Sequence, residues 1–158
     1  MAYQSTSELR SVFYENLSKE HLFGLLSESN NGHQIPMATL CIIRNLVDGS
    51  SDDVDNAVSH YGDQVLQSAV LILEGDYSID AKEQVLRIIA NMAYGEKTRD
   101  TLLSNDDLLR KVMDYMLHFK LSVQMAAIDA LTNLTVEADS TDYAANQKRC
   151  VVNLSFIN

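Results

Sequence analysis

Apolar residues in this chain recur at helical spacing, and the same pattern returns three times. Three segments align without gaps, beginning at residues 37, 83 and 125: MATLCIIRNLVDG, EQVLRIIANMAYG and MAAIDALTNLTVE. Each contains one asparagine in register, and these are Asn45, Asn91 and Asn133, 46 and 42 residues apart. A repeat at a nearly fixed interval predicts equivalent structural units stacked on one another.

Within each segment the apolar residues keep their positions relative to the asparagine. The positions five before, two before and one after it are apolar in every copy: Leu40, Ile43, Leu46, Leu86, Ile89, Met92, Ile128, Leu131 and Leu134. Residues three apart lie on one face of an α-helix, so this spacing describes a buried stripe. We therefore predict that each segment is an amphipathic helix packed into a core.

Two further helical stretches precede each of these helices. The longer ones cover residues 21–29, 63–75 and 107–119, and the shorter ones lie near 7–15, 52–61 and 97–103. No segment alternates apolar and polar residues over a useful length, so no strand is predicted. A three-helix unit every 42 to 46 residues lies in the range of armadillo and HEAT repeats, and it predicts an all-α solenoid of about three repeats.

We expect one domain over residues 1–158, with repeats at about 5–49, 50–95 and 96–138. Residues 139–158 begin like the first helix of a fourth repeat and are expected to be an incomplete repeat or a tail, as in a truncated or variant product. The last apolar face of a solenoid requires a cap or a neighbour. The apolar residues available in this segment are Val151, Val152, Leu154, Phe156 and Ile157.

Helix ends also carry local signals. Gly49 and Gly95 stand four residues after an asparagine, where a glycine commonly ends a helix. Pro36 is placed to open the first long helix. Capping boxes are predicted at Ser5 with Glu8, Ser50 with Asp53, Asp80 with Glu83, and Ser104 with Asp107.

Composition narrows the class of partner. The chain has 22 acidic and 12 basic residues, a net charge of -10, which argues against nucleic acid because such binding depends on clustered Lys and Arg. No apolar run approaches the roughly 20 residues of a membrane span, and the N-terminus lacks the features of a secretory signal. Cys41 and Cys150 stand far apart, which fits a reducing compartment. We expect a cytoplasmic and nuclear protein that binds neither nucleic acid nor membrane.

Candidate catalytic and metal-binding patterns are not found in the sequence. No phosphate-binding glycine motif or nucleophile elbow occurs, and the four histidines have no metal-ligand spacing. The acidic pairs Asp52-Asp53 and Asp106-Asp107 fall at predicted helix starts, where they favour the helix dipole. We therefore predict no enzymatic activity, no cofactor and no metal.

The pattern small-Leu-x-Asn-Leu near the end of each third helix, complete in residues 130–134 and with Ile or Met at some positions in the other two copies, resembles the armadillo repeat. Residues 85–134 resemble more closely the C-terminal repeats of the armadillo-repeat scaffold subunit of the CTLH/GID E3 ubiquitin ligase. The residues that carry the resemblance are Asn91, Ala93, Gly95, Ser104 to Leu109, Lys111, Tyr115, Met116 and Leu121 to Asn133. The resemblance implies a non-catalytic scaffold whose partners are other protein subunits of a ubiquitin ligase complex.

The resemblance also places Asn45, Asn91 and Asn133 along a concave surface built from third helices. An amide side chain both donates and accepts hydrogen bonds, so a row of asparagines suits the backbone of an extended peptide. Alternatively, each asparagine ties down the backbone of its own or the next repeat near a helix end. Both interpretations are open at this point.

Armadillo adaptors for nuclear-import signals pair each such asparagine with a tryptophan one turn earlier. Here that position holds Cys41, Arg87 or Asp129, and the chain has no tryptophan. Capture of import signals is therefore not expected, although another groove ligand is compatible with the pattern. The predicted partner-binding residues are Asn45, Arg87, Asn91, Asp129 and Asn133.

Overall fold

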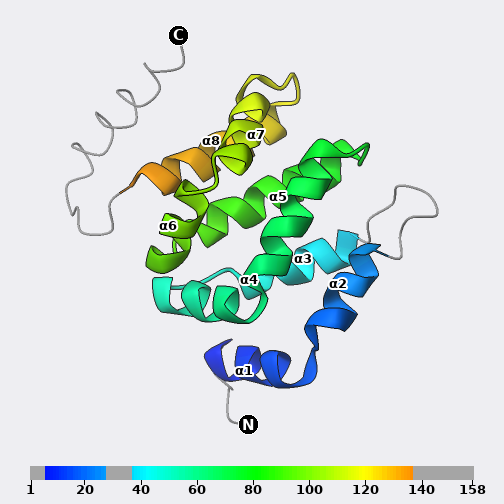
Figure 1. The fold of residues 1–158 in the computed structure, drawn as a ribbon, viewed down its shortest axis with the longest axis vertical. Helices are drawn as coiled ribbons and strands as arrows, with labels where there is room; N and C mark the ends of the chain where they lie inside the picture. Colours follow the sequence, from blue (N-terminus) through cyan, green and yellow to red (C-terminus); the bar gives the residue numbers. More distant parts are fainter. Residues whose placement is uncertain (1–5, 28–36, 137–158) are drawn as a thin grey trace.

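The computed structural model of the chain describes residues 6–27 and 37–136, and within them every regular element is a helix (Figure 1). The elements are α1 (Thr6–Asn16), α2 (Lys19–Ser27), α3 (Met37–Leu46), α4 (Ser51–Glu74), α5 (Ile79–Met92), α6 (Glu96–Leu103), α7 (Asp106–Asp114), the 3₁₀ helix η2 (Tyr115–Leu117) and α8 (Leu121–Thr135). The predicted all-α class is confirmed.

The three helices that contain the aligned asparagines lie next to one another. Helix α5 packs against α3 on one side and α8 on the other (Figure 1). Their apolar stripes form the core: the three stripe residues of α3, the three of α5, and Leu134 of α8 are all buried. Ile128 and Leu131 are only partly buried, because α8 is the last described helix of the stack.

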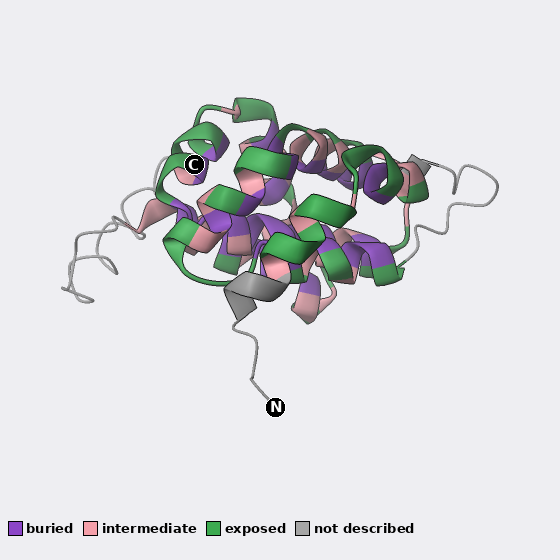
Figure 2. Ribbon diagram, turned by 90° about the horizontal axis from the view of Figure 1, so that it is seen from below, coloured by how far each residue is buried: buried purple, intermediate pink, exposed green. Residues whose placement is uncertain are grey.

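Buried residues gather on the surfaces that helices turn toward each other, whereas exposed residues cover the outside (Figure 2). Leu86, Ile89 and Met92 of α5 are each fully buried, at 0% exposure. Shortening such a side chain to alanine costs about 2–5 kcal/mol, because the transfer energy is lost and a cavity remains. Helix α5 is therefore the centre of the packed interior.

One prediction about element boundaries is wrong. Residues 52–61 and 63–75 were expected to be separate helices, but they form the single helix α4, which runs unbroken through Gly62. Tyr61 and Val65, on either side of this glycine, are both buried. Contacts with α1, α2, α5, α6 and α7 along its length hold α4 together where local propensity is weakest.

The predicted helix starts are right at one described position and wrong at two. Ser50 and Asp53 form the expected capping box at the start of α4. Helix α5 is capped by Ser78, whose Oγ accepts from Ala81 N at 3.2 Å, rather than by Asp80 with Glu83. Asn105 caps α7 by accepting from Leu108 N at 3.0 Å, in place of the Ser104 box.

The two glycines have different roles. Gly49 follows the end of α3 and has φ of 145°, a conformation that side chains other than glycine rarely adopt. Gly95 does not close α5, which ends at a C-cap on Ala93; it is the N-cap of α6. The capping prediction at Ser5, the role of Pro36 and the expected tail at 139–158 lie outside the described residues.

No helix in the part of the chain that the structure describes combines the length and apolar character needed to cross a membrane. The division into repeats at about 5–49, 50–95 and 96–138 stays a prediction.

Candidate functional site

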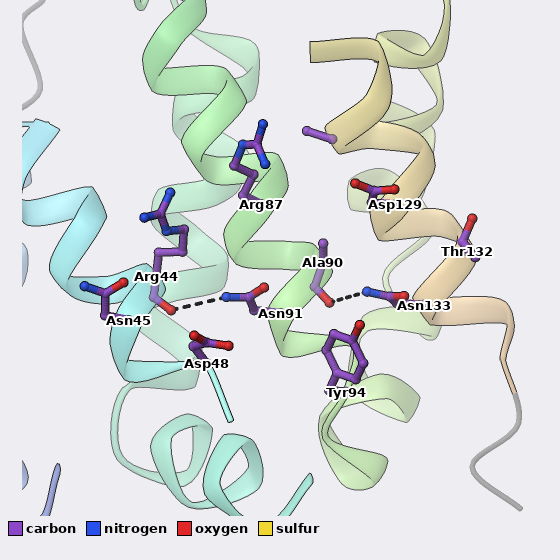
Figure 3. A pocket seen from close by; sticks show the side chains of 11 residues that line it. Arg44, Asn45, Asp48, Arg87, Ala90, Asn91, Tyr94, Asp129, Thr132 and Asn133 are labelled. Atoms are coloured by element: carbon purple, nitrogen blue, oxygen red, sulfur yellow. Dashed lines mark hydrogen bonds between the residues drawn. The ribbon is translucent and has the colours of Figure 1, made fainter. Parts of the chain in front are cut away.

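A polar groove crosses the row formed by α3, α5 and α8. It encloses about 570 Å³, and all five residues predicted from the sequence line it (Figure 3). Asn45 comes from α3, Arg87 and Asn91 from α5, and Asp129 and Asn133 from α8. The structure thus brings together residues that are up to 88 positions apart, while their role in binding a partner stays a prediction.

Two of the asparagines tie neighbouring helices together. Asn91 Nδ2 donates to the backbone oxygen of Arg44 at 3.3 Å, and Asn133 Nδ2 donates to that of Ala90 at 3.0 Å. Both acceptors lie in the last turn of their helix, where carbonyl groups lack intrahelical donors. Each asparagine therefore caps the preceding third helix. The second interpretation is right that the bond lies near a helix end, but it expected the acceptor in the asparagine's own or the next repeat, and both acceptors lie in the helix before it.

These bonds use only part of each amide. Among the described residues, the side chains of Asn91 and Asn133 each make this one hydrogen bond, which leaves the side-chain carbonyl oxygen and a second N–H for a ligand. Asn45 is exposed, and its side chain makes no hydrogen bond within the same part of the chain. Its whole amide is available, so Asn45 is the asparagine least committed to holding the fold.

The groove presents charges of both signs. Arg87 Nη2 lies 3.1 Å from Glu83 Oε1, and Arg44 Nη1 donates to Gln84 Oε1 at 2.8 Å. Both guanidinium groups are therefore held by side chains of α5. Asp129 is exposed and has no ion pair within the described ranges. A ligand with both donor and acceptor groups fits such a lining better than a purely apolar one.

Glu83 links the groove to α8. Its Oε2 accepts from the Ser122 hydroxyl at 2.6 Å and lies 3.2 Å from Lys120 Nζ. The hydrogen bond from Ser122 lowers the pKa of the Glu83 carboxyl despite its burial, and Lys120 and Arg87 lower that pKa further. Glu83 thus stays ionised at neutral pH and fixes the position of Arg87 in the groove.

Several known proteins are similar to this chain over most of its length. Armadillo repeat-containing protein 8 of Mus musculus is 39% identical over 135 residues, or 85% of the chain, and the Xenopus laevis protein of the same name matches equally. The Danio rerio protein of that name is 37% identical over 134 residues. The chain is an armadillo-type α-solenoid. No protein-family model matches it.

The resemblance to the armadillo scaffold subunit is confirmed at the level of these curated relatives. The chain spans about one fifth of their length, 20% for the mouse protein and 18% for the frog protein. Relatives named for armadillo repeats support a protein-interaction role, because such solenoids offer long concave binding surfaces.

The polar groove also contains residues that the sequence pattern did not single out. Arg44 and Thr132 each precede an asparagine, and Asp48 and Tyr94 each follow one by three positions. Residues three or four apart share a helix face. Asp48, Tyr94 and Thr132 each follow a predicted site residue by three positions, and Arg44 precedes Asp48 by four, so the same spacing would have found them. The Tyr94 side chain, 55% exposed, places an aromatic ring at the edge of the groove.

The described residues include no group of three or more His, Cys, Asp or Glu side chains close enough to hold a metal ion. The groove is instead lined by amides, guanidinium groups, carboxylates and hydroxyls, which can form hydrogen bonds and ion pairs with a peptide.

Proposed function

We propose that this chain is a non-catalytic scaffold within a CTLH/GID-type E3 ubiquitin ligase complex, where it supports ubiquitin-dependent protein degradation. The observation that carries the proposal is the 39% identity with armadillo repeat-containing protein 8, together with the resemblance of residues 85–134 to the scaffold subunit of that complex. Such a role belongs in the cytoplasm and nucleus. Its partners are other protein subunits of the complex.

A scaffold acts by holding partners at a fixed separation, which raises the effective concentration of one near another. The packed stack of α3, α5 and α8 provides the required rigidity, since asparagine bonds and buried stripes connect each helix with the next. The groove supplies a surface on which one partner is held. In this mechanism the chain contributes geometry and no chemical step.

Affinity purification of the tagged chain, followed by quantitative mass spectrometry, tests the assignment to the complex. We expect ligase subunits to be enriched over a tag-only control. Leu86→Asp, which places a charge in the core, is the matched variant that should lose them with the fold. Recovery of no ligase subunit by the folded wild-type chain would contradict the assignment.

A second candidate function is a generic armadillo adaptor for an extended peptide. It is favoured by hydrogen-bonding groups that are available in the polar groove, namely the side-chain amide of Asn45 and the side-chain oxygen and second N–H of Asn91. The Asn45→Ala variant tests peptide binding without disturbing the fold, because the Asn45 side chain makes no hydrogen bond within the described residues. We expect that variant to lose affinity for a groove peptide while circular dichroism and thermal stability are unchanged.

A further inference from the structure

A second hollow lies between α4 and the turn that joins α6 to α7. It encloses about 400 Å³ and is lined by Leu66, Gln67, Val70 and Leu71 of α4 and by Asn105. None of these residues lines the polar groove formed by α3, α5 and α8. Among the described residues, these two recessed surfaces are therefore separate, and the second is mainly aliphatic.

The aliphatic side chains of this hollow are partly or largely exposed to solvent. Leu71 is 63% exposed. Leu66 and Val70 pack one side against the core and leave the other side open. A contiguous aliphatic patch that is bordered by polar residues marks a site of protein interaction more often than scattered exposed leucines do.

Acidic residues border the patch. Asp63, Gln67 and Leu71 follow one another at intervals of four, and Glu74 comes three residues later, so all four share one face of α4. Asp63 and Glu74 therefore stand at the two ends of the aliphatic stretch. Both carboxylates are exposed.

The opposite rim, at the start of α7, is also acidic. Asp106 and Asp107 directly follow Asn105, and both are exposed. Lys111 Nζ lies 2.8 Å from Asp107 Oδ1 and 2.7 Å from Glu74 Oε1, so this one cation is shared by two carboxylates. Arg110, the residue before Lys111 on α7, is a second cation and is exposed. Asp63 and Asp106 have no ion pair within the described part of the chain, which leaves the border with an excess of negative charge.

We propose that this hollow docks an amphipathic helix of a partner protein whose aliphatic stripe is flanked by Lys and Arg. Leu66 and Val70 are one turn apart along α4, and Leu71 directly follows Val70 and widens the apolar surface, against which the ridge of a second helix can pack. The acidic border selects basic flanks through charge complementarity. The surface goes beyond the proposed scaffold function, since it lets one chain hold a second partner away from the polar groove.

The same charges disfavour other occupants. A second copy of this chain carries the same net charge of -10, so two acidic surfaces would have to meet. Anionic lipid and nucleic acid are repelled for the same reason. A basic helix is the occupant whose charge and shape both agree with the border and the hollow.

Fluorescence anisotropy with two labelled synthetic helices tests the proposal. Each has about 18 residues, long enough to be helical, with the same leucine stripe; one has lysine flanks and the other glutamate flanks. We expect the lysine helix to bind the chain at least about tenfold more tightly than the glutamate helix. Raising the salt concentration from about 0.05 to about 0.5 M should reduce that preference severalfold.

Leu71→Glu should weaken binding of the lysine helix by about tenfold or more, because it puts a charge into the aliphatic patch. Leu117→Glu is the matched control: Leu117 is 89% exposed and lies outside the hollow, so the same substitution should leave the affinity unchanged. Circular dichroism verifies that both variants keep their helicity.

Three results would each overturn the proposal: no binding of the lysine helix, equal binding of both helices, or unchanged binding of the lysine helix by the Leu71→Glu variant. If Asn45→Ala lost binding of the lysine helix and Leu71→Glu did not, the helix would be bound in the polar groove, and this result would also overturn the proposal.

Discussion

At the scale of single residues, the asparagines of the repeat combine two roles that the sequence alone left as alternatives. Asn91 and Asn133 each use one N–H to cap the carbonyl of the preceding third helix, and the rest of the amide faces the groove. Asn45 has no such bond within the described residues. The same residue type at equivalent positions therefore contributes differently to stability.

Replacing these residues by alanine should separate the two roles. Asn91→Ala and Asn133→Ala each remove the donor to a part-buried carbonyl, so we expect each to reduce the free energy of unfolding by about 1 kcal/mol. Asn45→Ala should change it by less than about 0.5 kcal/mol. Urea denaturation of the three variants measures the difference. Equal losses at all three positions would show that the asparagine bonds do not stabilise the stack.

A second residue that acts across elements is Asp55 of α4, which caps α6. Its Oδ1 accepts from Thr98 N at 3.1 Å and from Thr98 Oγ1 at 2.8 Å, and its Oδ2 accepts from Lys97 N at 3.3 Å. The N-cap position of α6 is Gly95, which has no side chain to do this. A Cβ at Gly95 would lie 2.4 Å from Asp55 Oδ1, so the glycine makes room for the carboxylate.

This carboxylate should make stability depend on pH. Burial alone would raise the pKa of Asp55, but the hydrogen bonds from Thr98 and Lys97 lower it overall. A lowered folded-state pKa means that the stabilisation is complete above the unfolded value of about 3.9 and is lost as pH falls through the folded value. We expect Asp55→Ala to cost about 1 kcal/mol at neutral pH, typical of a lost cap. Denaturation at decreasing pH should show the difference from wild type shrinking below about pH 4; a gap that grows there would contradict this assignment.

At the scale of elements, four of the polar bonds between helices end on carbonyl groups at or just beyond helix C-termini. Besides the asparagines, Tyr61 donates from its hydroxyl to the backbone oxygen of Leu17 at 3.0 Å, and Tyr115 does so to Leu73 at 2.8 Å. Unsatisfied carbonyls at the end of one helix are thus paired by the next element. These bonds fix the order and angle of the stack, whereas the apolar contacts supply most of its stability.

Tyr115→Phe tests this arrangement, because the ring and its packing remain while the hydroxyl is lost. We expect about 1 kcal/mol of destabilisation, visible as a lower melting temperature. Tyr94→Phe is the control, since Tyr94 is exposed and its hydroxyl makes no hydrogen bond within the described ranges. A Tyr115 variant as stable as the Tyr94 variant would mean that the bond to Leu73 adds nothing.

At the scale of the whole molecule, contacts run mainly between neighbours, so local stability should vary along the stack. Helix α5 has packed helices on both sides, whereas α1 packs mainly against α4. The attachment of α1 includes an ion pair of 3.2 Å between Arg10 Nη1 and Asp53 Oδ2. The centre of the molecule is therefore the part least able to open without global unfolding.

Native-state hydrogen exchange should reflect this gradient. We expect the amides of α5 to exchange most slowly and those of α1 to exchange fastest among the described helices. Arg10→Ala should accelerate exchange in α1 without affecting α5, because it removes only the ion pair with Asp53 and the hydrogen bond to the Asp48 carbonyl. Uniform protection across both helices would instead indicate a single cooperative unit.

The helical periodicity of the sequence was sufficient to predict the all-α class and the three equivalent helices, and the resemblance to armadillo repeats implied a common line for Asn45, Arg87, Asn91, Asp129 and Asn133. Such features depend on which residues share a helix face, and spacing along the chain sets that directly. The unbroken course of α4, the caps at Ser78 and Asn105 and the role of Gly95 could not be read in this way. The caps at Ser78 and Asn105 are local bonds to the residue three positions on, and the sequence pattern did not decide which of the nearby polar residues makes each bond. The course of α4 and the role of Gly95 depend on packing or partners from other elements, such as Asp55 lying over the start of α6. The same is true of the asparagine bonds, whose acceptors are 43 or 47 positions away and become neighbours only when the repeats stack.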